Sequence, residues 1–191
     1  AGHWLGRLWQ MNRDVSVREH VVALLKALDP ALPERLSPET TAALIRAYAS
    51  PALVAPPAVD QGARAALEAL AAGGALLAVV SNTMRTPGEV VRQILDRSGL
   101  LPLFRVLVFS DECGIRKPSR GIFLRALKDL GVPAEHAVHV GDDSILDVEG
   151  ARDVGMAAIQ VTPDGRATAP VKPDAVIRHL GELPAALRRL R

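Results

Sequence analysis

Three short polar segments contain the side chains best suited to chemistry, and each follows directly after a run of apolar residues. They are Ser81-Asn82-Thr83 after residues 75–80, Ser110-Asp111-Glu112 with Lys117 after residues 103–109, and Gly141-Asp142-Asp143 with Asp147 after residues 137–140. A hydroxyl group and neighbouring backbone N–H groups can bind the oxygens of a phosphate. A lysine offsets the negative charge of that phosphate, and paired carboxylates bind a hard cation such as Mg²⁺. Together these groups suit phosphoryl transfer.

The apolar runs indicate how these side chains are positioned. Strands are expected at residues 75–80, 103–109, 137–140, 157–161 and 175–177, and helices at residues 61–72, 87–97, 119–130 and 147–154. Continuously apolar strands that alternate with helices are typical of a parallel sheet covered on both faces. Ligands bind at the carboxyl ends of the strands in such a fold. We therefore expect an α/β, doubly wound parallel sheet over residues 56–191, with the polar segments meeting at one edge.

The first 55 residues have a different pattern, which indicates helices and no strand. An apolar stripe at helical spacing runs from Val17 to Leu28. Ser37-Pro38 is a good helix start, because serine is a preferred cap and proline suits the first turn. The proline-rich stretch 50–57 then breaks the pattern and is typical of a linker. We expect residues 1–55 to form a small helical unit beside the sheet.

The composition excludes several classes of protein. The chain has 23 basic and 21 acidic side chains, and its net charge of +2 is too small for a strong field toward nucleic acid. Cys113 is the only cysteine, which excludes an internal disulfide and a multi-cysteine metal site. No apolar run has the length of a membrane span, and no signal peptide is visible. We expect a cytoplasmic protein that binds neither nucleic acid nor membrane.

The polar segments also resemble the motifs of a known superfamily. The sequences VVSNT at 79–83, SDECGIRKP at 110–118 and HVGDDSILDVEGARDVGM at 139–156 look like the second, third and fourth motifs of haloacid dehalogenase (HAD) superfamily hydrolases. Their order and their placement at strand ends also match. The resemblance implies that Ser81 binds the phosphoryl group with the Asn82 backbone nearby, and that Lys117 steadies the phosphate and the nucleophile.

The same resemblance implies Mg²⁺ as the cofactor. Asp142 would be a ligand of the metal, and Asp147, the second acid of the fourth motif, would support the metal. Asp143 is a further candidate ligand. Residues 1–55 resemble the remaining part of the small helical cap that such enzymes insert after their first strand.

Taken alone, each segment has an ordinary structural explanation. Residues 81–83 would serve as a helix cap, and residues 141–143 as a turn followed by a helix cap. The joint order of the segments at strand ends favours the HAD interpretation. His139 alternates with apolar strand residues and is interpreted as packed in the core. Arg116 is compatible with facing either substrate or solvent.

The sequence departs from the HAD pattern at the nucleophile. The family uses an Asp-x-Asp pair after its first strand, in which the first Asp attacks phosphorus to give an aspartyl-phosphate and the second is the general acid/base. No such pair precedes Ser81, because Asp14, Asp29 and Asp60 are isolated and none follows an apolar strand. In the family this strand is central, between the strands that end at Ser81 and Asp142. Its loss would leave two strand edges unpaired inside the core.

We therefore expect the chain to be inactive as it stands. Its expected partner is an N-terminal fragment of a longer or nicked protein, or a strand borrowed from elsewhere, as in a homo-oligomer. With that segment, the expected activity is Mg²⁺-dependent hydrolysis of a small phosphorylated metabolite, because residues 141–143 resemble the metal-binding phosphatase pattern. The alternatives are a non-catalytic HAD-like domain for binding or assembly and, less favoured, a haloacid dehalogenase. The sequence specifies neither the substrate nor the oligomeric state.

Overall fold

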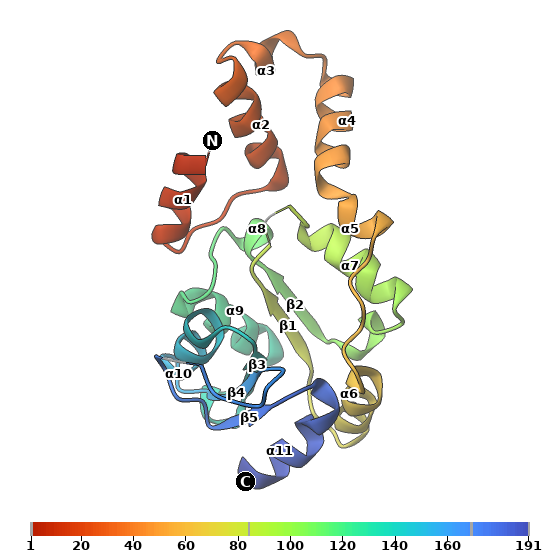
Figure 1. The fold of residues 1–191 in the computed structure, drawn as a ribbon, viewed down its shortest axis with the longest axis vertical. Coiled ribbons are helices and arrows are strands. Elements are labelled where there is room, and N and C mark those ends of the chain that lie inside the picture. The colour runs from red at the N-terminus through yellow and green to blue at the C-terminus, as the bar shows by residue number, and fades with distance from the viewer. Residues whose placement is uncertain (1, 84, 169, 191) are drawn as a thin grey trace.

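The computed structural model describes residues 2–83, 85–168 and 170–190. The first part of the chain is helical, as predicted. Figure 1 shows helices α1 to α4 grouped at one end of the molecule, with the strands at the other. The helices of this part are α1 (Gly2–Gln10), α2 (Val17–Leu28), α3 (Leu32–Arg35), α4 (Pro38–Ala49) and α5 (Pro51–Val54).

Local signals in the sequence explain where the two longest of these helices begin. Ser16 caps α2, and it forms a capping box in which the Glu19 side chain returns to the Ser16 backbone. Ser37 caps α4 by accepting from the Thr40 N–H, with Pro38 in the first turn. The helices are observed, and the division of the chain at residue 55 stays a prediction.

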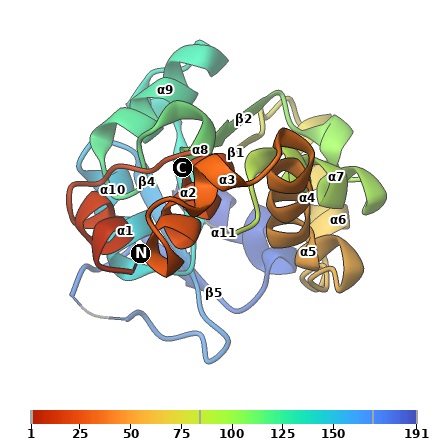
Figure 2. The same ribbon diagram turned by 90° about the horizontal axis from the view of Figure 1, so that it is seen from above.

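Residues beyond the helical part alternate between strands and helices. The strands are β1 (Ala78–Ser81), β2 (Val106–Phe109), β3 (Val138–Gly141), β4 (Ala157–Val161) and β5 (Ala175–Ile177). The helices are α6 (Ala63–Ala72), α7 (Gly88–Arg97), α8 (Ser110–Cys113), α9 (Arg120–Leu130), α10 (Gly150–Arg152) and α11 (Leu183–Leu190). A π-helix, Ser144–Glu149, precedes α10. The two views agree that α9 and α10 lie on one side of the strands and α6 and α7 on the other (Figures 1 and 2).

All strand pairs are parallel, which confirms the predicted fold class. Within the described residues the strands form two sheets, β1–β2 and β3–β4–β5. Ser81 lies opposite Phe109 in the first sheet, and Gly141 lies opposite Gln160 in the second. Among the described residues β1 pairs only with β2 and β3 pairs only with β4, so each of these two strands has one edge without a strand partner.

Apolar packing joins the two sheets into one core. One cluster combines Val108 of β2, Ile122 and Phe123 of α9 and Ala158 of β4, all at most 6% exposed. A second cluster, centred on Ile159 and Ile177, packs α11 and part of α6 against the β3–β4–β5 sheet. Burial of this apolar surface is the main force that holds the helices on both faces.

The helical part contacts the core at α5, where Arg97 donates to the Leu53 carbonyl (3.0 Å), and through a short loop. Arg13 pairs with Ile115 in an antiparallel bridge. On either side of it, the Asp14 N–H donates to the Gly114 carbonyl (3.1 Å) and the Arg116 N–H donates to the Asn12 carbonyl (3.0 Å). In the part of the chain that the structure describes, no helix has the length and apolar character needed to cross a membrane.

Candidate active site at the carboxyl ends of the strands

The structure brings the segment after β1 and the predicted lysine together. Ser81 is the last residue of β1, and Asn82 follows it. The Asn82 side chain accepts from the Lys117 N–H (2.7 Å) and donates to the Lys117 carbonyl (3.0 Å). These two bonds fix the backbone of Lys117 against the end of β1. The segment does not cap a helix, since α7 begins at Gly88 with Pro87 as its N-terminal neighbour.

The Lys117 side chain then reaches the end of β3. Its Nζ lies 2.6 Å from Oδ1 of Asp147, and the two side chains are 13% and 5% exposed. Asp147 Oδ1 also accepts from Nε2 of His139 (2.9 Å), and Oδ2 accepts from the Asp143 N–H (3.1 Å). Hydrogen bonds therefore connect Asn82, Lys117, Asp147 and Asp143, which come from all three predicted segments.

The surroundings of Asp147 keep its carboxylate ionised. Burial raises the pKa of this group, but the hydrogen bond from His139 and the positive charge of Lys117 outweigh that effect and hold the pKa well below its usual range. A charge-assisted bond of this kind is stronger than a neutral one. Lys117 is consequently held in one place by an acceptor that stays charged at neutral pH.

Gly141 is required by the close approach of Asp147 to the end of β3. A methyl group added at Gly141 would overlap the Asp147 side chain. The glycine therefore allows Asp147, which lies in the π-helix, to turn back toward Lys117.

The two exposed acids that follow β3 have different roles. One carboxylate oxygen of Asp143 accepts from the N–H groups of Ile145 and Leu146, both at 2.8 Å, so Asp143 caps the π-helix. Among the described residues, the Asp142 carboxylate has no hydrogen-bond or ion-pair partner. The Asp142 backbone carbonyl accepts from Nε2 of Gln160 (3.0 Å), which fixes the position of the residue.

Within residues 2–83, 85–168 and 170–190, no group of three or more acidic, histidine or cysteine side chains is arranged to hold a metal ion. Asp147 is occupied by Lys117 and His139, and Asp143 by the helix end. Asp142 is the member of the predicted metal set whose carboxylate is available to a cation. The assignment of Asp142, Asp143 and Asp147 to a metal site stays a prediction.

A surface hollow of about 520 Å³ opens beside the end of β1. Hydroxyl, amide and guanidinium groups line it, together with one apolar side chain. The lining residues are Ser81, Asn82, Thr83, Arg85, Thr86 and Val91. Among the described residues that line this hollow there is a guanidinium group and no carboxylate, so its surroundings favour an anionic ligand.

Two residues discussed from the sequence make side-chain contacts that no local sequence pattern could predict. Arg116, expected to face substrate or solvent, is 9% exposed and its guanidinium stacks 4.6 Å from the centre of the Trp9 ring. His139 packs edge-on against Phe123 as expected, but its bond to Asp147 was missed. The side chain of His139 is 10% exposed, and strand alternation indicated its packing but not its hydrogen-bond partner.

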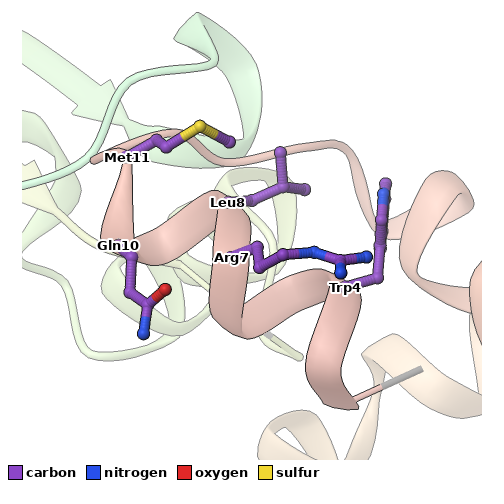
Figure 3. A pocket seen from close by; sticks show the side chains of 5 residues that line it. All are labelled: Trp4, Arg7, Leu8, Gln10 and Met11. Carbon is purple, nitrogen blue, oxygen red and sulfur yellow. The ribbon is translucent and has the colours of Figure 1, made fainter.

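A second hollow, of about 380 Å³, lies on α1 and includes none of the predicted site residues. Figure 3 shows that the Arg7 side chain extends toward Trp4, while Gln10 points away from them. Trp4 is 36% exposed there. Part of the Trp4 ring is therefore uncovered in this chain.

The parallel α/β core, with a lysine–carboxylate pair at its strand ends, places the chain in the Rossmann-like class of folds, in which ligands bind at that edge of the sheet. Comparison with known protein families gives the particular group. Residues 6–155 match the haloacid dehalogenase-like hydrolase family, so the chain belongs to that family and the resemblance seen in the sequence is confirmed.

Individual relatives support this assignment. The chain is 40% identical over 107 residues to haloacid dehalogenase-like hydrolase domain-containing protein 3 of Xenopus laevis, covering 56% of this chain and 42% of that protein. The structure resembles a HAD phosphatase from Thermococcus onnurineus (TM-score 0.60, 35% identity, 66% of this chain and 57% of that one). It also resembles a 2-haloacid dehalogenase from Pseudomonas syringae pv. Tomato DC3000 (TM-score 0.65, 26% identity, 99% and 88% covered). The chain spans half or less of the length of the curated relatives it matches first.

Proposed function

We propose that the full-length protein hydrolyses a small phosphomonoester with the help of Mg²⁺. The observation that carries this proposal is the position of Lys117, which is held between Asn82 and Asp147 beside the end of β1. A buried, fixed ammonium group stabilises negative charge more strongly than a mobile one in water. A transferring phosphoryl group has that charge, and the neighbouring hollow suits its oxygens.

Within this proposal the residues of the chain bind and orient the phosphate. The Ser81 hydroxyl and the backbone after it would hold non-bridging oxygens, and Lys117 would neutralise them. Asp147 keeps the Lys117 ammonium in place. His139 in turn keeps Asp147 oriented and ionised.

The nucleophile is proposed to lie on a segment outside residues 1–191. The unpaired edges of β1 and β3 support this proposal, because a further parallel strand between them would satisfy both edges and complete one sheet. A carboxylate at the carboxyl end of such a strand would lie between Ser81 and Asp142. It would attack phosphorus to give an aspartyl-phosphate, which water then hydrolyses.

The site fits a hard cation at one point. The Asp142 carboxylate is exposed at the end of β3, and its backbone is fixed by Gln160. Oxygen ligands of this kind suit Mg²⁺, which when bound neutralises the oxygens of the transferring group. Asp142 would hold the cation, Asp143 would lie beside it, and the remaining ligands would come from the segment that supplies the nucleophile.

A haloacid dehalogenase is the second candidate, because a structure of that name resembles nearly the whole chain. The available Asp142 carboxylate favours the phosphatase, since a dehalogenase needs no metal. A third candidate is a non-catalytic domain that keeps the fold for binding or assembly. It is favoured only if no Asp-x-Asp segment joins the chain.

The test is an assay of the full-length protein with phosphomonoesters and with 2-haloacids, in the presence of Mg²⁺ and of EDTA. We expect phosphate release that EDTA abolishes and that Asp142→Ala reduces at least about 100-fold. The matched control is Asp96→Ala, which removes an exposed aspartate of α7 and should leave turnover unchanged. Metal-independent turnover of a haloacid, or full activity of Asp142→Ala, would contradict the proposal.

The proposed partner segment has a separate test. Intact-mass spectrometry of the folded, purified protein under denaturing conditions should show either a longer chain or a second small polypeptide that contains Asp-x-Asp. A folded sample containing the 20.3 kDa chain alone would show that β1 and β3 remain stable without a strand between them. That result would favour the non-catalytic alternative, or a second copy of this chain as the partner.

A further inference from the structure

A buried set of polar residues connects the loop before α2 to the segment after β1, and the proposed chemistry does not use it. Asp14, His20, Thr83 and Ser110 are 3%, 1%, 3% and 0% exposed. Asp14 and His20 belong to the helical part, whereas Thr83 and Ser110 follow β1 and β2. Burying polar groups this deeply costs free energy unless they are hydrogen-bonded, so the partners of these side chains matter for stability.

The Ser110 hydroxyl is the centre of this set. Its oxygen lies 2.6 Å from Oδ2 of Asp14, to which it donates, and it accepts from the Thr83 N–H at 2.8 Å. A serine hydroxyl has one hydrogen. Because the Ser110 hydroxyl donates this hydrogen to Asp14, its lone pairs can accept the hydrogen bond from the Thr83 N–H.

Without Asp14 the same hydrogen has other acceptors. The Thr83 carbonyl lies 3.4 Å from the Ser110 oxygen, and the Thr83 hydroxyl lies 3.1 Å from it. Donation to either would turn the hydroxyl and weaken its bond with the Thr83 N–H. Asp14 therefore selects one of several arrangements at the end of β1.

Asp14 is a strong and immobile acceptor. Burial raises the pKa of its carboxyl, but the neighbouring His20 ring, the Ser110 hydroxyl and the Arg116 guanidinium outweigh burial and lower that pKa. Nε2 of His20 lies 3.5 Å from Oδ1. The backbone is held as well, because the Asp14 N–H donates to the Gly114 carbonyl.

Thr83 extends this set of hydrogen bonds to Asp111. Its hydroxyl donates to Oδ1 of Asp111 (2.5 Å) and accepts from the Asp111 N–H (3.0 Å). Asp111 in turn accepts from the Gly88 N–H at the start of α7 (3.2 Å). Asp111 therefore binds both Thr83, which follows Ser81 and Asn82, and Gly88 at the start of α7.

We propose that Asp14 is a positioning residue, which couples the loop of residues 11–16 to the phosphate-binding segment 81–83 through the Ser110 hydroxyl. The functional half of this inference rests on the proposed phosphate site. Through this coupling a movement of the helical part would affect the site, because a shift of the loop would weaken the hydrogen bond from the Thr83 N–H to Ser110.

The first test measures the coupling without any ligand. Residue-resolved amide hydrogen exchange of the full-length protein is compared for wild type, Asp14→Ala, Asp14→Asn and Asp29→Ala, the last removing a half-buried aspartate at the end of α2 in the same helical part. In Asp14→Ala we expect the Thr83 amide to exchange at least about tenfold faster, with the Ile159 amide in the core unchanged. Asp14→Asn keeps an acceptor oxygen and should restore most of the protection, and Asp29→Ala should match wild type.

The second test measures orthophosphate binding with Mg²⁺ present, by calorimetry. Asp14→Ala and Ser110→Ala should each weaken binding about tenfold or more, and the double variant should be no weaker than the worse single one. If Asp14→Ala does not fold, Ser110→Ala breaks the same connection from the core side. Unchanged Thr83 exchange in Ser110→Ala and Asp14→Ala overturns the coupling, and unchanged phosphate binding overturns its role at the site. Wild type that binds no phosphate counts against the proposed function, and the exchange pattern still decides the coupling.

Discussion

Replacing Asp147 by Asn tests whether the ion pair with Lys117 holds the site together. The substitution keeps the shape of the side chain and removes its charge. The Lys117 ammonium, 13% exposed, would then lie beside a neutral amide, and the His139 ring would lose its charged acceptor. Breaking one side of a buried pair costs about 3–5 kcal/mol, because the other charge stays buried without compensation.

The expected loss can be measured by thermal or urea unfolding followed by circular dichroism. For a chain of this length each kcal/mol lowers Tm by about 2–4 °C, so Asp147→Asn should lower Tm by roughly 10 °C. The exposed Asp96→Asn is the matched control and should change the free energy of unfolding by less than about 0.5 kcal/mol. A loss below about 1 kcal/mol for Asp147→Asn would refute the importance of the pair.

The difference in stability between wild type and Asp147→Asn is also expected to depend on pH. The pKa of Asp147 is lowered in the folded state from an ordinary value of 3.8. Its stabilising contribution is therefore complete above the unfolded pKa and is lost as the pH falls through the lower folded pKa. The difference in unfolding free energy between wild type and Asp147→Asn should stay constant from about pH 5 to pH 8 and shrink below about pH 4. A difference that grows toward low pH would contradict this assignment.

The remaining predictions concern the two residues that place Asp147 and Lys117. Gly141→Ala should destabilise the protein by about 1–3 kcal/mol, because the added methyl group displaces the Asp147 side chain; a urea midpoint equal to wild type would contradict the packing argument. Asn82→Ala removes both bonds to the Lys117 backbone and should lower kcat/KM of the full-length protein about tenfold or more, measured by phosphate release, whereas an unchanged kcat/KM would show that Lys117 is held without Asn82.

Much of the core could be predicted from the sequence, because its strands are continuously apolar and its helices have clear ends. The strands at residues 157–161 and 175–177 have the predicted bounds. The strand expected from residue 103 begins at Val106, because Leu101–Leu103 forms a 3-10 helix with Pro102 in it. The helix expected from residue 147 begins three residues earlier as a π-helix, since Asp143 caps it.

The site could be predicted only as a set of strand ends. Residue types after the strands indicated Ser81, Asn82, Lys117 and Asp147, and the structure links the last three by hydrogen bonds, whereas the role of Ser81 stays a prediction. The hydrogen-bond partners of each side chain could not be predicted, because they depend on contacts between segments that are distant in the sequence. Asp14 is the clearest case: it looked isolated in the sequence, and its hydrogen-bond partner Ser110 is 96 residues away.

The most direct test of the account is to trap the phosphorylated enzyme. The full-length protein would be mixed with a phosphomonoester substrate and Mg²⁺, quenched in acid, digested and mapped by mass spectrometry. We predict a hydroxylamine-sensitive phosphoryl group on an aspartate outside residues 1–191, and its absence in Asp142→Ala. A phosphoryl group on a residue within 1–191, or rapid turnover with no phosphorylated aspartate, would contradict it.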